Sequence, residues 1–332
     1  MTSLADESAL LAQLRDLGQQ GRHRELLERL RTLPVAVLES RTALALLTAE
    51  TLGRLGDHTG ATRWTGLALA VARSRGERQA ELRALNYHGA IALRRGDVDE
   101  AEQHVGEALE LARALQDHAA QARCLNNLGI IASLRGDADA ALGSYQLALA
   151  AYQQAGLVRG MAETHHNIAI SWRERRDHGR ALEAADQAVR LAGLVRDDSL
   201  LGLALMGRAE IHLLMSDDDL AGVELERAAE AYRRVDFEAG LPEVWRLQAA
   251  VARVRGDLPE ALRLLRQAAE LATTQGSAEA LAAVERDLGA ALYADGDLAE
   301  AQAARQRALA LYRRLGASKA AGELAGLLSQ EP

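Results

Sequence analysis

The sequence predicts an all-α protein, built as a right-handed superhelical solenoid of helix hairpins. Gly-Asp dipeptides begin at residues 56, 96, 136, 256 and 296, and Asp177 and Asp217 mark the two intervening positions, so the interval is always 40 residues. Small residues recur in register with these dipeptides. Hydrophobic residues make up 48% of the 332 residues but aromatic residues only 3%, a composition that favours closely packed helices over sheets. Such a fixed period indicates a repeat architecture.

Each Gly-Asp position is expected to be the turn of a helix hairpin. Glycine adopts the left-handed conformation that ends a helix, and the following aspartate caps the next helix through its carboxylate. In the second hairpin this predicts helices from Gln79 to Arg95 and from Val98 to about Leu115. Pro242 and Pro259 fall at expected helix starts, where a missing N–H costs nothing.

Three columns of small residues predict where the helices touch. Residues seven apart lie on one helix face, and small side chains there allow a close approach of the neighbouring helix. The column seven before the turn reads Ala49, Gly89, Gly129, Ala169, Ala209, Ala249 and Gly289. The columns five and twelve after it contain only alanine, from Ala61 to Ala301 and from Ala68 to Ala308.

The same register explains three Arg-Gly-Asp triplets, at Arg95, Arg135 and Arg255. The tripeptide is known as an adhesion signal, but here Gly-Asp is the turn. The arginine is the exposed last residue of a helix, where a positive charge complements the helix dipole. We interpret the triplets as structural.

This arrangement resembles the tetratricopeptide repeat family. Leu128-Gly129, Gly136-Asp137, Ala141, Ala148 and the tyrosines at 145 and 152 match its signature. The resemblance covers residues 41–316 as seven repeats, although the usual period of the family is about 34 residues. The long period is similar to that of kinesin light chains, bacterial peptide-sensing regulators and the arms of bacterial transcription activators. Residues 1–40 resemble a degenerate N-terminal repeat or cap with its turn at Gly21, and residues 317–332 a C-terminal capping helix and tail.

Catalytic motifs are absent from the sequence, so we expect no enzyme. There is no GxxxxGK[ST], GxGxxG or GxSxG. Glu163 and His166 have the spacing of a di-iron ligand pair, but no second pair accompanies them. The acids at 217–219 fit a helix start, and Cys124 fits a small core residue. We therefore expect no metal and no cofactor.

The resemblance implies that the first helix of each hairpin lines a concave groove that binds extended peptides. The groove-facing columns lie thirteen, ten, nine, six and three residues before each turn. The polar residues expected to bind the peptide are Arg83, Asn86, Arg123, Asn126, Asn127, His166, Asn167, Arg173, Arg246 and Arg286.

Four asparagines on one predicted helix face require a reason, because asparagine is a mediocre helix former. Its amide can pair with the N–H and C=O groups of a peptide backbone, while arginine can bind carboxylates. The alternative is structural: the amides are solvated or form bonds between adjacent helices.

Charge and termini limit the partners. The formal net charge of −8 provides no basic field for nucleic acid. No apolar run suits a membrane helix, and the N-terminus carries acids where a signal peptide carries bases. We expect a bacterial cytoplasmic scaffold or adaptor that binds a protein or peptide. The sequence does not decide whether the chain forms a homodimer.

The alternative is a regulatory sensor that binds a small peptide or metabolite and acts through a partner. Only the segment 1–40 precedes the repeats, so no DNA-binding domain of its own is expected.

Overall fold

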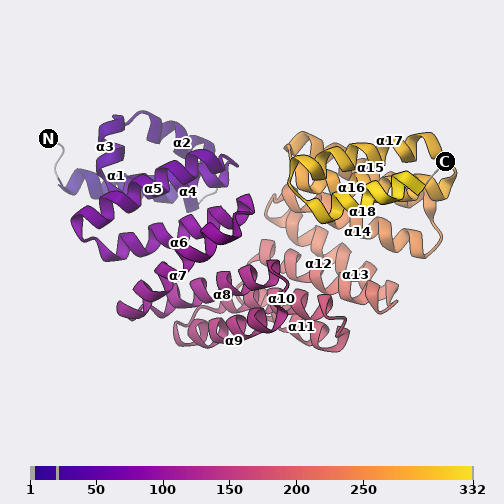
Figure 1. The fold of residues 1–332 in the computed structure, drawn as a ribbon, viewed down its shortest axis with the longest axis horizontal. Coiled ribbons are helices and arrows are strands. Elements are labelled where there is room, and N and C mark those ends of the chain that lie inside the picture. The colour runs from indigo at the N-terminus through magenta and orange to yellow at the C-terminus, as the bar shows by residue number, and fades with distance from the viewer. Residues whose placement is uncertain (1–3, 20–21, 331–332) are drawn as a thin grey trace. The chain divides into compact units, whose positions relative to one another are not determined.

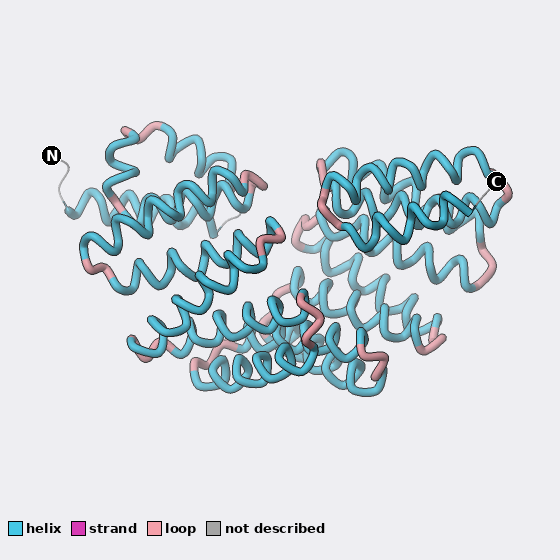
Figure 2. The backbone as a smooth tube through the Cα atoms, in the orientation of Figure 1, coloured by secondary structure: helices cyan, strands magenta, loops and turns pink. Residues whose placement is uncertain are grey.

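The computed structural model describes residues 4–19 and 22–330, which form eighteen α-helices, one short 3₁₀ helix and no strand (Figures 1 and 2). The all-α prediction is thus confirmed. The turn expected at Gly21 lies outside the described residues.

The helices, in chain order, have the following bounds: α1 Leu4–Gln19, α2 His23–Arg31, α3 Val35–Ser40, α4 Thr42–Arg54, α5 His58–Arg75, α6 Arg78–Arg95, α7 Val98–Ala114, α8 His118–Leu134, α9 Ala138–Gln154, α10 Val158–Glu174, α11 His178–Leu194, α12 Asp198–Leu214, α13 Asp218–Arg234, η1 Glu238–Gly240, α14 Leu241–Val254, α15 Leu258–Gln275, α16 Ala278–Asp295, α17 Leu298–Arg314 and α18 Ser318–Gln330.

Every expected hairpin turn is present, from the α4–α5 turn to the α16–α17 turn. In the α8–α9 turn, Gly136 is left-handed with φ of 79°, and the Asp137 N–H donates to the Ala132 carbonyl over 2.9 Å. The Asp137 carboxylate then accepts from the Ala140 N–H over 3.0 Å. Aspartate therefore closes one helix and caps the next. Only Asp97 lacks this cap among the seven turn aspartates; it pairs with Arg95 over 2.5 Å instead.

A second series of turns lies midway along the chain between successive Gly-Asp turns. It joins each hairpin to the next helix, again through a left-handed residue: Gly76, Gln116, Gly156, Arg196, Asp236, Gly276 and Gly316. Left-handed residues therefore recur at every half repeat along the array. Each repeat consists of two helices and two short turns, and most of these helices have the 17 or 18 residues seen in α6 to α9.

The small-residue columns form the helix contacts. The alanines from Ala61 to Ala301 and from Ala68 to Ala308 are at most 1% exposed. A Cβ atom at Gly129 would lie 2.4 Å from the Tyr145 ring of α9, closer than real Cβ contacts allow. Glycine is therefore required there, and the predicted register is confirmed.

The chain divides into two compact units, residues 1–164 and 165–332, and the boundary falls within α10. In the first unit, a large buried cluster runs through α4 to α8, and a smaller one around Leu14, Leu26 and Leu44 joins α1, α2 and α4. In the second unit, α18 packs on α17 through Leu324 and Tyr312.

Candidate ligand-binding face

The first helices of the hairpins in the first unit, α4, α6 and α8, form a face with a hollow of about 230 Å³. Its lining includes three residues predicted to bind a peptide, Arg83, Asn86 and Arg123. Tyr87 lies in the same wall and donates its hydroxyl proton toward the backbone carbonyls of Ala49 and Glu50, at 3.3 and 3.4 Å. The predicted columns of α6 and α8 thus meet at one hollow.

The two arginines of this hollow are available to a ligand. Arg83 and Arg123 are exposed, and neither makes a hydrogen bond or ion pair with any described residue. Two unpaired guanidinium groups therefore give this hollow a local positive charge. They suit a carboxylate, which arginine binds in bidentate fashion.

A second hollow of about 520 Å³ lies beside the first, and Glu50 lines both. Arg15 of α1 and Arg54 of α4 add positive charge to its wall. Desolvation raises the pKa of Glu50, and the charges of Arg83, Arg15 and Arg54 partly oppose this shift. Glu50 is thus a carboxylate surrounded by several arginines, and Asp117 is the other acid that lines the first hollow.

The asparagines combine both interpretations considered from the sequence. The Asn86 Oδ1 atom accepts from the Cys124 thiol of α8 at 3.6 Å, and the Asn126 Oδ1 atom accepts from the Thr164 hydroxyl of α10 at 3.1 Å. These amides therefore join adjacent first helices. The half-buried Asn127 makes no hydrogen bond with any described residue, so its amide is the one available to a ligand.

In the second unit, the predicted His166 and Asn167 are half-buried on α10. The His166 ring packs against Gly207 of α12, where an added Cβ would lie 2.9 Å from the ring. Desolvation, assisted by the charge of Arg173, lowers the pKa of His166 to about 4. The ring is therefore neutral near pH 7.

The remaining predicted arginines are occupied by acids of the second unit. Arg173 pairs with Glu210 of α12, and Arg246 of α14 lies 3.8 Å from the same carboxylate. Arg246 also pairs with Glu243 at 2.5 Å and with Asp287 of α16 at 2.6 Å, and Arg286 pairs with Asp287 at 2.8 Å. We name this chain of three arginines and three acids the ion-pair ladder.

The ion-pair ladder changes what these arginines can do. Burial alone would lower the pKa of Arg246, but the hydrogen bonds and charges of Glu243 and Asp287 outweigh it and raise the pKa. Because each arginine is already neutralised by an acid, a ligand carboxylate would have to displace that acid. The second unit is thus less suited to acidic ligands than the first.

The other residues weighed for chemistry have ordinary roles. Glu163 forms an ion pair with Arg159 at 3.0 Å, and Asp217 caps α13. Asp219 binds Arg255 at 2.6 Å. Burial raises the pKa of the Cys124 thiol to about 12, so this cysteine is an unreactive core residue, as predicted.

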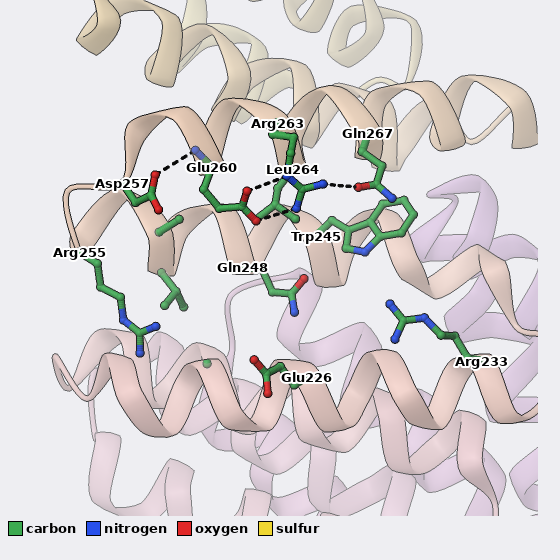
Figure 3. A pocket seen from close by; sticks show the side chains of 13 residues that line it. Glu226, Arg233, Trp245, Gln248, Arg255, Asp257, Glu260, Arg263, Leu264 and Gln267 are labelled. Carbon is green, nitrogen blue, oxygen red and sulfur yellow. Dashed lines mark hydrogen bonds and ion pairs between the residues drawn. The ribbon is translucent and has the colours of Figure 1, made fainter.

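The second unit has a further hollow of about 510 Å³ between α13, α14 and α15 (Figure 3). Trp245 forms part of its wall, and Arg263 is held there by Glu260 and Gln267. Glu226, Gln248 and Arg233 line it without a hydrogen bond or ion pair to described residues. Two of its three helices are second helices, so sequence reasoning aimed at first helices missed it.

Sequence reasoning also missed Arg15, Arg54 and Glu50. Arg15 precedes the repeats, and Arg54 and Glu50 fall in the first repeat. The groove-facing columns ten and nine residues before the turn contain Leu46 and Leu47 in this repeat, so it was expected to be apolar. Glu50 lies in the groove-facing column six residues before the turn at Gly56, so that column could have identified it, whereas Arg54 lies outside these columns.

Stacked helix hairpins with a hollowed first-helix face define a helical-repeat scaffold. The tetratricopeptide repeat family model matches residues 80–154 and 240–314. The chain therefore contains tetratricopeptide repeats in these two segments, both of which lie within the array of 40-residue repeats. No curated protein matches it. Among the described residues, no helix is both long and apolar enough to cross a lipid bilayer.

Several solved structures share the fold. A Rap conjugation gene regulator of plasmid pLS20, solved with the Phr* peptide, is 13% identical with a TM-score of 0.67; the match covers 84% of this chain and 76% of that one. A Rap protein complexed with competence and sporulation factor is 14% identical with a TM-score of 0.63, covering 97% and 96%. The quorum sensor NprR of B. thuringiensis is 13% identical with a TM-score of 0.56, covering 98% of each chain.

Proposed function

We propose that this chain is a non-catalytic adaptor that binds an extended, acidic peptide or protein tail on the first-helix face of its first unit. The observation that carries the proposal is the pair of unpaired arginines, Arg83 and Arg123, at one hollow. Asn127, one turn from Arg123 on α8, adds an amide that can donate to and accept from a peptide backbone.

The ligand is expected to carry a carboxylate, either its C-terminus or an acidic side chain. Arg15, Arg54, Arg83 and Arg123 bring four positive charges to the two hollows, against the negative charges of Glu50 and Asp117. In the second unit, we propose that His166, Asn167, Arg173, Arg246 and Arg286 form a binding surface of their own. It would act through neutral polar contacts, since the ion-pair ladder neutralises the arginines.

The proposal includes three further expectations. Residues 1–40 and 317–332 act as caps of a seven-repeat array at 41–316. The protein works in a bacterial cytoplasm, without direct contact with nucleic acid. Its function does not require a homodimer, although one is compatible with it.

The test begins with a pull-down from the native source, followed by peptide-array mapping of the captured partner. Titration calorimetry then compares variants. Arg123→Ala should weaken binding at least about fivefold at low salt and less at high salt, because this contact is Coulombic and exposed. Asn127→Ala should weaken binding equally at both salt concentrations.

Arg63→Ala is the matched control, since Arg63 is also exposed and unpaired but lies on a second helix, α5. It should leave the affinity unchanged. If Arg63→Ala abolishes binding while Arg83→Ala and Arg123→Ala bind like wild type, the ligand uses the other side of the hairpins and the proposal is wrong.

A regulatory sensor is the alternative. The solved structures of similar fold include a quorum sensor and Rap proteins with bound peptide or factor. They support a sensor function for this chain by analogy of fold. The two functions differ in one measurement. A sensor's affinity for its protein partner changes when the small ligand is added, whereas an adaptor binds its partner in the same way with or without other small molecules.

A further inference from the structure

Two histidines and a glutamate meet between α6 and α7, away from the hollow lined by Arg83. Donor atoms of His88, Glu100 and His104 all lie within 4.8 Å of one another. The His88 and His104 rings are stacked, with centroids 4.1 Å apart and planes 22° apart. The His88 Nε2 atom is 3.2 Å from the Glu100 Oε1 atom.

These imidazoles are poorly satisfied by the protein alone. His88 is only 9% exposed, and the Nδ1 atoms of both histidines are buried with no hydrogen-bond partner among the described residues. A buried polar atom without a partner costs free energy that folded proteins normally avoid. Two such atoms beside a carboxylate therefore indicate that this cluster binds a ligand.

We propose that His88, Glu100 and His104 bind a divalent transition-metal ion of the zinc class, with water completing the coordination shell. Two imidazoles and one carboxylate are a donor set that such ions prefer. Bonds of about 2.0–2.1 Å at tetrahedral angles place donor atoms about 3–3.5 Å apart. Because imidazole lone pairs lie in the ring plane, binding requires the two rings to rotate out of their stacked arrangement, from a starting point where the donor atoms already lie within 4.8 Å of one another.

The surroundings support this assignment. Glu100 and His104 are partly exposed, which gives an ion a path from solvent. The Glu100 Oε2 atom lies 3.6 Å from Arg95, so this arginine can orient the carboxylate while Oε1 faces His88.

The position of the cluster also has a structural consequence. His88 belongs to α6, whereas Glu100 and His104 lie one turn apart on α7. A bound ion would therefore join the two helices of the second hairpin across their turn. Because an ion that binds only the folded state stabilises it by mass action, added metal should raise the unfolding temperature.

The test uses the full chain, stripped with a chelator and titrated with ZnCl₂ in a calorimeter. We expect one equivalent to bind, and an unfolding temperature that rises with zinc and returns to its starting value with EDTA. His104→Gln and Glu100→Gln should each weaken zinc binding at least about tenfold, since even partners outside the coordination shell contribute that much. Substitution with Co²⁺ should give a visible absorption band that both variants lose.

His178→Gln is the matched control, because His178 also has a buried, unpaired Nδ1 atom but lies outside the cluster. It should bind zinc like wild type. Circular dichroism without metal should show all variants folded, since both substitutions on α7 are at partly exposed positions. The proposal is overturned if wild type does not bind zinc, or if His104→Gln and Glu100→Gln bind it as tightly as His178→Gln.

Discussion

The left-handed residue that ends each first helix is glycine in five hairpins, but Arg176 and Ser216 in the other two, with φ of 61° and 60°. A side chain makes this conformation cost about 1–2 kcal/mol. Glycine avoids that cost but loses more conformational freedom on folding, which offsets part of the gain.

We therefore expect Arg176→Gly and Ser216→Gly each to raise the free energy of unfolding by about 0.5–1 kcal/mol. Denaturant melts of the single variants would measure it. Gly136→Ala is the reverse experiment and should be destabilising, because it introduces the same strain at φ of 79°. A loss of stability in both glycine variants would show that the strain is relieved by other contacts.

Asn126 and Asn127 are neighbours in sequence with different environments, so their alanine variants should behave differently. Asn126→Ala removes the acceptor of the buried Thr164 hydroxyl, whose proton the Gly160 carbonyl also accepts at 2.8 Å. It should lower the free energy of unfolding by about 1 kcal/mol. Asn127→Ala loses no such bond and should leave stability unchanged or slightly higher, because alanine is the better helix former.

Thermal melts and peptide titrations of both variants would separate these roles. Only Asn127→Ala should weaken peptide binding without a cost in stability. Equal melting behaviour of the two variants would contradict the assignment of Asn126 to a bond between α8 and α10.

At the scale of the helix, the close packing of small residues makes a direct prediction. Ala148 is completely buried beside Ala122 and Tyr152. Ala148→Leu should overpack this contact and lower the free energy of unfolding by about 1–3 kcal/mol. Arg135→Ala, which removes exposed ion pairs to Asp99 and Glu102, should cost only a few tenths. Denaturant melts giving the opposite ranking would contradict the packing register.

Helix ends show how far sequence reasoning reached. The α6 helix starts at Arg78 and ends at Arg95, within one residue of the prediction, because Gly96-Asp97 determines the turn. The turns between hairpins were harder to see. Gln116, Arg196 and Asp236 share one left-handed conformation but no chemical type, since several residues tolerate it at moderate cost. Glycine occupies the other four positions, 76, 156, 276 and 316, so the sequence signature of this column is weaker than that of the Gly-Asp turns but is present.

At the scale of the whole chain, the sequence predicted which columns face a ligand but not which side chains remain free. Arg123 and Arg246 occupy groove-facing columns on equivalent first helices, yet only Arg123 is unpaired. The difference arises from acids 41 residues later or on adjacent helices, such as Asp287 and Glu210. Whether an arginine forms an ion pair depends on side-chain rotamers and distances, which the repeat alignment of the sequence does not show.

The ion-pair ladder predicts an acid-sensitive second unit. Burial alone would raise the pKa of Asp287, but the hydrogen bond and charge of Arg286, with those of Arg246, outweigh it and lower the pKa. A lowered folded-state pKa means that Asp287 stabilises the fold above its unfolded pKa of about 3.9, and that this stability is lost as the pH falls through the lower folded value.

Stability measured from pH 7 to pH 2 should therefore fall steeply below about pH 4. Asp287→Asn should reduce stability at pH 7 and flatten this fall. Glu270→Gln, at an exposed position on α15 without an ion pair to any described residue, serves as the control and should leave the profile close to wild type. A profile unchanged by Asp287→Asn would mean that other carboxylates dominate acid unfolding.

The left-handed turns that recur at every half repeat have a consequence for how such a chain can change length. An insertion or deletion of half a repeat reconnects the chain at an equivalent left-handed turn, so the local backbone conformation is preserved. A splice of a whole repeat also keeps the alanine columns on the correct helices. A change of half a repeat would place every later first helix where a second helix belongs. Its small contact residues would then no longer face the helices on which they pack. Duplication and deletion are thus restricted to whole hairpins by side-chain packing, although the joints themselves allow half steps.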